Sequence, residues 1–225
     1  MFEFQLAINE STFLNYLFLI ISYAILGGGV KYIDDAFDEG TFSKNKALLL
    51  IPFLAVFGAW ILTTSIASAT ILMAIVLGVL IKGKIDNIAF KIGFFVLIAI
   101  LFFFGYLNFL WVLLIILTLS GIIDEIGNDY ADRKNLYAKG DPLSKFFHLF
   151  FEYRFTMKVF VFSFAFLGFF GWQYFLAFLA FDLAYAGVMH YSNRLIRKGK
   201  FTYIERNHNG NGFLKGVTNA GRRAP

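Results

Sequence analysis

The chain contains no cysteine and only three prolines among its 225 residues, and charged residues make up only 16% of it. The absence of cysteine excludes disulfides, thiolate nucleophiles and cysteine metal sites. The charged fraction is well below the roughly 25% of typical soluble domains. Hydrophobic residues instead supply 59% of the chain, with 31 phenylalanines. A soluble fold of this size cannot hide so much apolar surface, so the composition predicts a membrane protein.

Seven stretches of the sequence are apolar enough to cross a membrane as helices. A bilayer core about 30 Å thick needs about 20 apolar residues, with a lower limit near 17. The stretches are 12–30, 47–64, 66–82, 90–105, 108–124, 157–171 and 173–191. Short polar hinges separate several neighbouring stretches. We therefore expect an all-α, polytopic transmembrane helix bundle of about seven spans, with six or eight spans as alternatives.

The basic residues fall on one side of the membrane when the chain is threaded through seven spans. Residues 31–46, 82–91, 124–158 and 194–225 hold every Lys and Arg, and the segments on the other side hold none. Under the positive-inside rule the basic side is cytoplasmic. The sequence thus predicts an integral protein of a prokaryotic cell membrane, with the N-terminus outside and the C-terminus in the cytoplasm. Because the net charge of +5 forms no stripe on a soluble domain, nucleic acid is not an expected partner.

We expect two parts in the chain. Residues 1–193 are predicted to form the transmembrane helical domain, with cytoplasmic acidic loops at 31–46 and 124–158. Within the second loop, Pro142 and the aromatic run that follows it indicate an interfacial amphipathic helix. Residues 194–225 are predicted to form a basic, flexible cytoplasmic tail that contacts membrane lipids.

Two clusters of oxygen ligands follow the first and the fifth predicted span. The members are Asp34, Asp35 and Asp38 in the first cluster and Asp124, Asn128, Asp129 and Asp132 in the second. If the helices continue through these segments, the spacing of three and four places the side chains on one face, where like charges repel. Carboxylates at a helix C-terminus also oppose the helix dipole. A bound cation offsets both costs, and Mg²⁺ prefers such ligands together with phosphate oxygens. The alternative is a wetted loop in which Asp and Lys neutralise each other.

These clusters resemble the two Asp-rich motifs of the UbiA superfamily of intramembrane prenyltransferases. The first family motif has the form N-D-x-x-D-x-x-x-D-x-x-N. Asp34, Asp35, Asp38 and Asn45 are similar to it, with Asp34 in place of the leading Asn and Phe42 in place of the third Asp. In the second cluster, Asn128-Asp129-x-x-Asp132 repeats the string N-D-x-x-D. The chain is shorter than the family and has fewer spans.

The resemblance implies transfer of a prenyl group from a prenyl diphosphate to a lipophilic acceptor within the membrane, with Mg²⁺ as cofactor. Members of both clusters would hold the metal. Basic residues between and beside the clusters would stabilise the departing diphosphate, namely Lys44, Lys82 and Arg133. The residues expected to bind substrate are Asn45, Lys84, Lys134, Arg154, Lys158 and Asp182.

Asp182 leaves a second function open. It lies about eleven residues before the basic border of its span, or about 17 Å deep at 1.5 Å per residue. A carboxylate at such depth costs at least about 2.5 kcal/mol, so it should face the bundle interior. One alternative is a transporter or channel that moves a cation or proton past Asp182 and the acidic clusters. Another is a membrane protein without catalytic activity.

Overall fold

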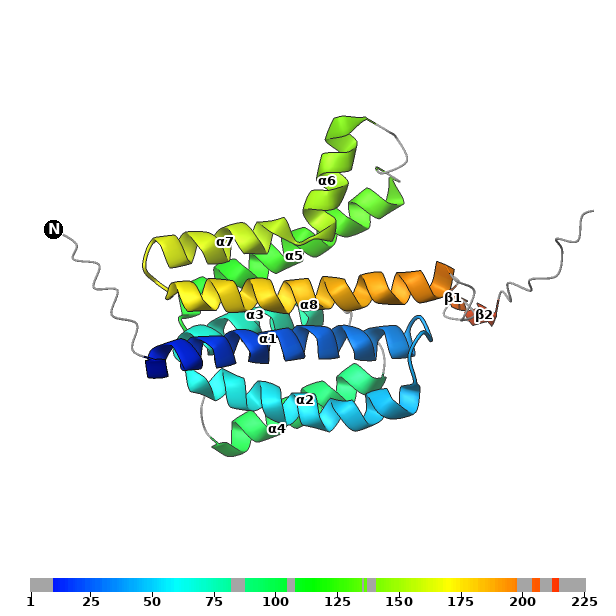
Figure 1. The fold of residues 1–225 in the computed structure, drawn as a ribbon. Coiled ribbons are helices and arrows are strands. Elements are labelled where there is room, and N and C mark those ends of the chain that lie inside the picture. Colours follow the sequence, from blue (N-terminus) through cyan, green and yellow to red (C-terminus); the bar gives the residue numbers. More distant parts are fainter. Residues whose placement is uncertain are drawn as a thin grey trace, which may run out of the picture.

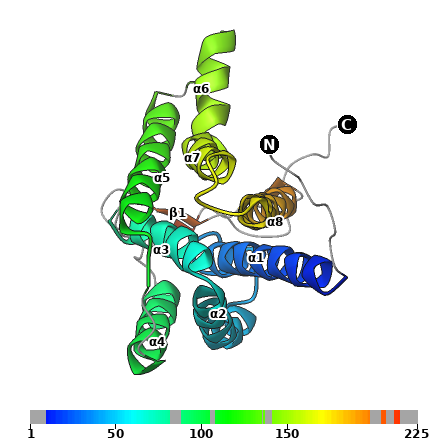
Figure 2. The ribbon, with the colours of Figure 1, turned by 90° about the vertical axis from the view of Figure 1, so that its left-hand side faces the viewer.

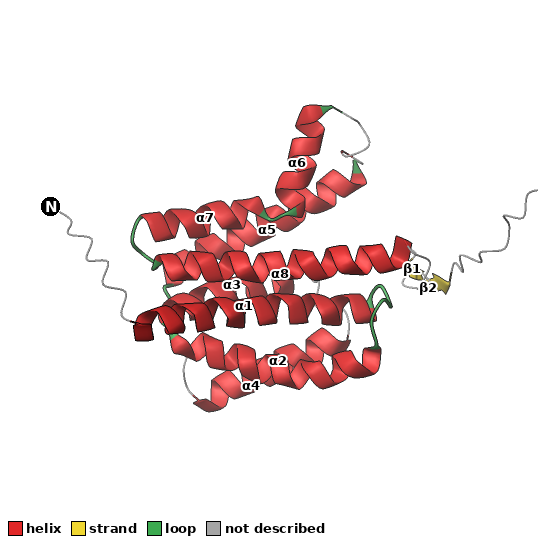
Figure 3. Cartoon of the chain, viewed as in Figure 1, coloured by secondary structure: helices red, strands yellow, loops and turns green. Residues whose placement is uncertain are grey.

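Helices form almost all of the part of the chain that the computed structural model describes, which is residues 10–81, 88–104, 108–134, 136, 141–197, 204–206 and 212–214 (Figures 1 and 3). The eight helices are α1 (Glu10–Phe37), α2 (Lys44–Thr64), α3 (Ile66–Ile81), α4 (Ile88–Phe104), α5 (Trp111–Arg133), α6 (Pro142–Glu152), α7 (Phe155–Phe166) and α8 (Trp172–Arg197). After α8, strands β1 (Ile204–Arg206) and β2 (Gly212–Leu214) pair antiparallel, with Ile204 opposite Leu214. The predicted all-α class is confirmed.

Seven of these helices lie side by side in one bundle, whereas α6 leaves it at a steep angle (Figure 1). Helices α1 and α8 run parallel at the centre (Figure 1) and share the most extensive contact. Helices α2 and α4 pack on one side of this pair, and α5 and α7 on the other. The view down the bundle shows α3 between the two groups (Figure 2). The bundle therefore brings together helices that are distant in sequence.

Four helices, α1, α2, α5 and α8, are long and apolar enough to cross a membrane, with apolar segments of 21–26 residues. Helices α3, α4 and α7 are apolar but shorter. The outside of the bundle carries large hydrophobic side chains, among them Leu49 at 78% exposed and Phe103 at 84%. Contiguous apolar surface of this kind marks contact with membrane or protein. Together with the four long apolar helices it identifies an integral membrane protein.

Each of the seven predicted stretches coincides with a helix, but α1, α5 and α8 run further than predicted and α7 ends earlier. Helix α1 continues to Phe37 and α5 continues to Arg133. Most of both acidic clusters is therefore helical, and the prediction of acidic loops is wrong at these positions. In α1 the physical reason is visible, because Ile33 and Ala36 remain buried and Lys31 pairs with carboxylates one turn further on.

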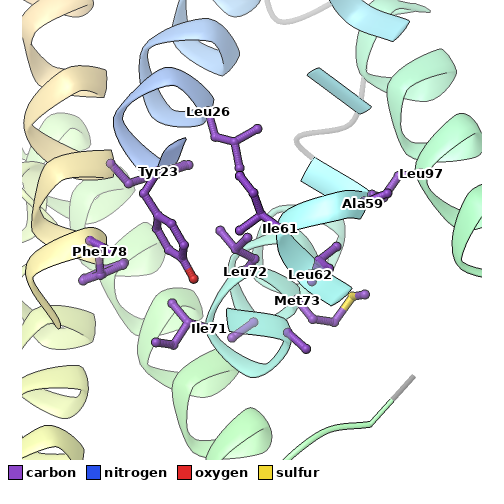
Figure 4. Close-up of a cluster of buried hydrophobic side chains, with 14 of the residues drawn as sticks. Tyr23, Leu26, Ala59, Ile61, Leu62, Ile71, Leu72, Met73, Leu97 and Phe178 are labelled. Carbon is purple, nitrogen blue, oxygen red and sulfur yellow. The ribbon is translucent and has the colours of Figure 1, made fainter. Parts of the chain in front are cut away.

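Glycines in α1 bring the central helices into close contact. A Cβ on Gly27 would lie 2.1 Å from the carbonyl oxygen of Phe181 in α8, and one on Gly29 would lie 2.5 Å from a methyl group of Leu54 in α2. The buried core extends from this contact between α1, α2, α3 and α8 (Figure 4). Only residues without a side chain allow so close an approach of the backbone. The run Gly27-Gly28-Gly29 thus fixes α1 against two neighbours at once.

Candidate functional site

The charged side chains gather at one end of the bundle. At this end α1, α3, α5 and α8 finish and α2, α4 and α7 begin (Figure 1). Every Lys and Arg of the described helices lies within about two turns of this end, or in α6 beside it. The described residues at the opposite end include no Lys or Arg.

Lys31 holds two carboxylates of the first cluster. Its ammonium group lies 2.7 Å from Asp34 and 2.9 Å from Asp35, one turn further along α1. Asp35 is buried, at 2% exposed. A buried charge needs a partner, because desolvation of a lone carboxylate is costly. The first cluster is therefore partly neutralised within its own helix.

Asp124 of the second cluster caps another helix. Its two oxygens accept hydrogen bonds from the backbone N–H groups of Thr156 (2.9 Å) and Met157 (2.8 Å), in the first turn of α7. The first N–H groups of a helix have no partner within the helix, so a carboxylate there satisfies them and also interacts favourably with the dipole. Asp124 is fully buried. This contact joins α5 to α7 and needs no cation.

Glu125, the next residue, pairs with Arg154 at the corner between α6 and α7. The guanidinium nitrogen Nη2 of Arg154 lies 2.9 Å from a Glu125 oxygen, and Glu125 is buried. Arg154 has a positive φ of 50°, a left-handed conformation that is uncommon for residues other than glycine. Such a conformation persists only where the surroundings hold it. The contacts with Glu125 and Tyr185 supply that support.

Tyr185 of α8 lies between the two sides of the charged end. The ammonium of Lys31 lies 5.3 Å from the centre of its ring, and the guanidinium of Arg154 lies 5.0 Å from it. Cations within about 6 Å of an aromatic ring are attracted by the ring quadrupole. Tyr185 thereby brings a cation from α1 and one from the α6–α7 corner to a single side chain, and each cation carries its own carboxylate partners.

Asp182, one turn before Tyr185 in α8, forms a salt bridge with Lys158 of α7. The same ammonium group donates a hydrogen bond to the carbonyl oxygen of Tyr153. The expectation that Asp182 faces the interior is consistent with its low exposure. We call the side chains of Lys31, Glu125, Arg154, Lys158, Asp182 and Tyr185 the charged cluster.

Other predicted site residues lie around this cluster at the same end. Lys44 and Asn45 are exposed in the first turn of α2, and Lys44 lies 5.7 Å from the centre of the Phe37 ring. Arg133 is exposed and donates a hydrogen bond back to the carbonyl oxygen of Asp129. Asp38, Asn128 and Asp129 are half-buried, and Lys134 is exposed. Lys82, Lys84 and the side chain of Asp132 lie outside the described residues.

The Mg²⁺ site that the resemblance implies requires several oxygen ligands that converge on one point. Within the described ranges, no three Asp, Glu or His side chains converge into a group that could hold a metal ion. The carboxylates nearest the centre already have partners, namely Lys31, Arg154 and the start of α7. The described side chains do not fit a metal ion in this arrangement.

An apolar cavity of about 190 Å³ lies between α1, α2, α3, α4 and α8. Only Gly, Ala, Val, Leu, Ile and Phe residues line it. A second pocket of about 20 Å³, lined partly by Glu125, Arg154 and Asp182, lies next to it. Ile75, Val79 and Phe181 line both spaces. An apolar space beside a charged pocket matches an amphiphile with an apolar chain and an anionic head.

The turn after α1 adds one further ionisable group. Burial raises the pKa of Glu39, and the neighbouring carboxylate of Asp35 raises it further, while Lys31 opposes the shift. Close by, the hydroxyl groups of Thr41 and Ser192 lie 2.8 Å apart and join this turn to α8. The end of α1 is thus fixed against α8 by a polar contact as well as by its glycines.

The sequence reading missed three residues of the charged cluster. The residues predicted from the sequence to form the site do not include Lys31, Glu125 or Tyr185. For Lys31 a signal existed, because Asp34 and Asp35 follow it at helical spacing. No comparable local signal marks Glu125 or Tyr185, whose partners come from other helices. Neither a family model, nor a curated protein, nor a solved structure matches this chain.

Proposed function

We propose that this protein is an intramembrane, UbiA-like prenyltransferase that moves a prenyl group from a prenyl diphosphate to a lipophilic acceptor. The observation that supports it best is the apolar cavity next to the charged pocket, with Ile75, Val79 and Phe181 lining both. In this proposal the prenyl chain occupies the cavity and the diphosphate meets the charged cluster. Binding sites for small molecules are usually apolar with a few polar groups that set orientation.

The proposal includes the orientation of the protein in the membrane. All seven helices of the bundle would cross the membrane, with the N-terminus outside and the basic end in the cytoplasm. Helix α7, with 12 residues, is only about 18 Å long. It therefore relies on the turn that follows it and on local thinning of the bilayer. This orientation presents the charged cluster to diphosphates dissolved in the cytoplasm.

The chemistry follows from the charges of the cluster. Transfer breaks the bond between C1 of the prenyl group and the diphosphate oxygen, forms a bond from C1 to the acceptor, and releases one proton from the acceptor. Arg154 and Lys158 would stabilise the negative charge that develops on the departing diphosphate. Arg is well suited to this role because its guanidinium binds phosphate oxygens in pairs. Glu125 and Asp182 are the carboxylates nearest to receive the proton.

A diphosphate must displace existing partners to bind here. The charged pocket of about 20 Å³ has room for about one water molecule. Arg154 and Lys158 would therefore exchange Glu125 and Asp182 for phosphate oxygens. Mg²⁺ remains a prediction of the resemblance, and the roles proposed for Arg154, Lys158, Glu125 and Asp182 do not require it.

The test uses the full-length protein in lipid nanodiscs with prenyl diphosphates of two chain lengths and a lipid acceptor fraction. Release of diphosphate and formation of prenylated lipid are expected, and both should fall at least about tenfold in Arg154→Gln. Ala55→Phe, which fills the cavity, should impair the long chain more than the short one. Leu49→Phe, on the exposed side of the same helix, should change neither. Absence of product with every donor, with and without Mg²⁺, would reject the proposal.

A transporter remains the second candidate because Asp182 carries a salt bridge within the bundle. Ionisable residues inside a membrane often mark paths for ions or protons. Reconstituted liposomes would then show proton or cation flux that Asp182→Asn abolishes and that needs no diphosphate. Flux of this kind without any prenyl transfer would favour the transporter.

A further inference from the structure

We propose that α6 lies in the membrane interface at the basic end, and that this contact with lipid holds the corner where Arg154 meets Glu125 and Tyr185. The inference rests on the membrane fold and not on the transferase activity. It assigns a partner, the boundary between lipid headgroups and acyl chains, to a helix that the bundle itself hardly covers.

The sequence of α6 separates into two faces. Ser144, His148 and Glu152 follow one another at intervals of four and form a polar stripe, in which His148 lies 3.4 Å from Glu152. Leu143, Phe146 and Phe147 belong to the opposite, apolar face. None of the eleven residues of α6 is buried, and these three are 64%, 57% and 43% exposed. An amphipathic helix with so much exposed aromatic surface is typical of helices that lie in an interface.

The position of α6 agrees with this partner. Helices α1 and α8 define the direction across the membrane, and α6 stands across that direction at the end that carries the basic residues (Figure 1). A helix in this place lies along the membrane surface. Lys145, next to the polar stripe, is exposed and suits anionic headgroups.

One edge of α6 is fixed to the bundle. A Cβ on Gly127 would lie 2.2 Å from the ring of Phe151, so α5 has room for this ring only because residue 127 is glycine. Phe150 stacks on Phe155 at the start of α7, with ring centres 5.6 Å apart. These contacts hold the C-terminal part of α6. Leu143 and Phe146 point away from the bundle core and are left for lipid.

The connection from α6 to Arg154 is short. Helix α6 ends at Glu152 and α7 begins at Phe155, so Tyr153 and Arg154 alone join them. Arg154 is left-handed at this corner, and Tyr153 contacts His190 of α8 at 3.3 Å. A change in the direction of α6 must therefore be taken up at Tyr153 or at Arg154, and Arg154 carries the Glu125 and Tyr185 contacts.

The absence of cysteine allows spin labels to be placed one at a time in the full-length protein in nanodiscs. A label at Phe146→Cys should be more accessible to oxygen, which dissolves in lipid, than to a water-soluble nickel chelate. A label at Ser144→Cys in the polar stripe should show the reverse order. Equal exposure of both labels to water would overturn the proposal. Dipolar broadening between labels at 146 in two molecules would also overturn it, because a second copy would then cover this face.

A second experiment tests whether lipid contact of α6 holds the corner at Arg154, by measuring distances between spin labels on α6 and α5. Distances between labels at Phe146→Cys and Ile126→Cys, which is exposed on α5, should form one narrow distribution in nanodiscs. Leu143→Asn should broaden it at least about twofold, whereas Ser144→Asn, in the polar stripe, should leave it unchanged. An equal distribution in all three proteins would show that lipid contact does not hold the corner. The accessibility of the labels would then test only whether α6 lies in the interface, and the proposed effect on the corner would be rejected.

Discussion

Gly27 and Phe181 bring α1 and α8 so close that a Cβ on residue 27 would lie 2.1 Å from the carbonyl oxygen of residue 181. The obstacle is backbone, which cannot turn away as a side chain can. The neighbouring Gly28 faces only methyl groups and an oxygen of α8, at 3.6 Å or more. Two adjacent glycines of one helix thus have different tolerance for a side chain.

Gly27→Ala is expected to lower the free energy of unfolding by about 1–3 kcal/mol, the usual cost of overpacking. Gly28→Ala is the matched control, because its methyl group meets neighbours at ordinary distances and alanine favours helix. Thermal unfolding in detergent, followed by circular dichroism, gives both values. Equal stability of the two variants would show that α1 and α8 are further apart than described.

Asp124→Ala is expected to cost about 1–2 kcal/mol, because two N–H groups at the start of α7 lose their acceptor. Asp124→Asn should cost less, since its amide oxygen still accepts one hydrogen bond. The loss should be the same in EDTA and in Mg²⁺ if capping is the main role of this carboxylate. A loss that appears only in Mg²⁺ would instead identify Asp124 as a metal ligand, and unfolding in both buffers separates the two roles.

Arg154 and Glu125 should show coupling in a double-mutant cycle. Arg154→Met leaves the buried Glu125 without its cation, and Glu125→Gln removes the charge that Arg154 neutralises. Each single change is expected to cost about 1.5–3 kcal/mol, the range for hydrogen bonds to charged groups. The double variant should cost less than the sum of the two. Additive losses in urea or SDS unfolding would mean that the pair contributes no coupling.

The raised pKa of Glu39 predicts how the free energy of unfolding depends on pH. Its pKa is raised in the folded protein, so between the ordinary value of about 4.3 and the raised one the folded state binds more protons than the unfolded chain. The free energy of unfolding should therefore fall as the pH rises through this window and level off above it. Glu39→Gln should remove this contribution, which SDS unfolding between pH 4 and pH 7 measures. Identical pH profiles of the two proteins would assign the dependence to another group.

Local sequence was sufficient for much of the fold. Apolar runs predicted the position of all seven helices of the bundle, because the length and hydropathy of a span are set by the bilayer. The amphipathic character of α6 could also be predicted, because the spacing of its polar residues follows the period of a helix. The pairing of Lys31 with Asp34 and Asp35 could also be predicted from local sequence, because these residues lie three and four positions apart on one helix. The apolar runs alone stop short of the ends of α1, α5 and α8, because tertiary contacts such as the burial of Ile33 and the capping of α7 by Asp124 hold polar segments in the helices.

Composition, span length and the positions of Lys and Arg are enough to predict a helical membrane protein with its basic residues at one end. The partner of each carboxylate, in contrast, depends on how the helices pack. Asp124 meets the start of α7 and Glu125 meets Arg154, each about thirty residues further along the chain. A carboxylate can be satisfied by a metal, an arginine or backbone N–H groups, and residue type alone does not distinguish them. The choice follows from helix packing, in which contacts as close as Gly27 to Phe181 fix the register.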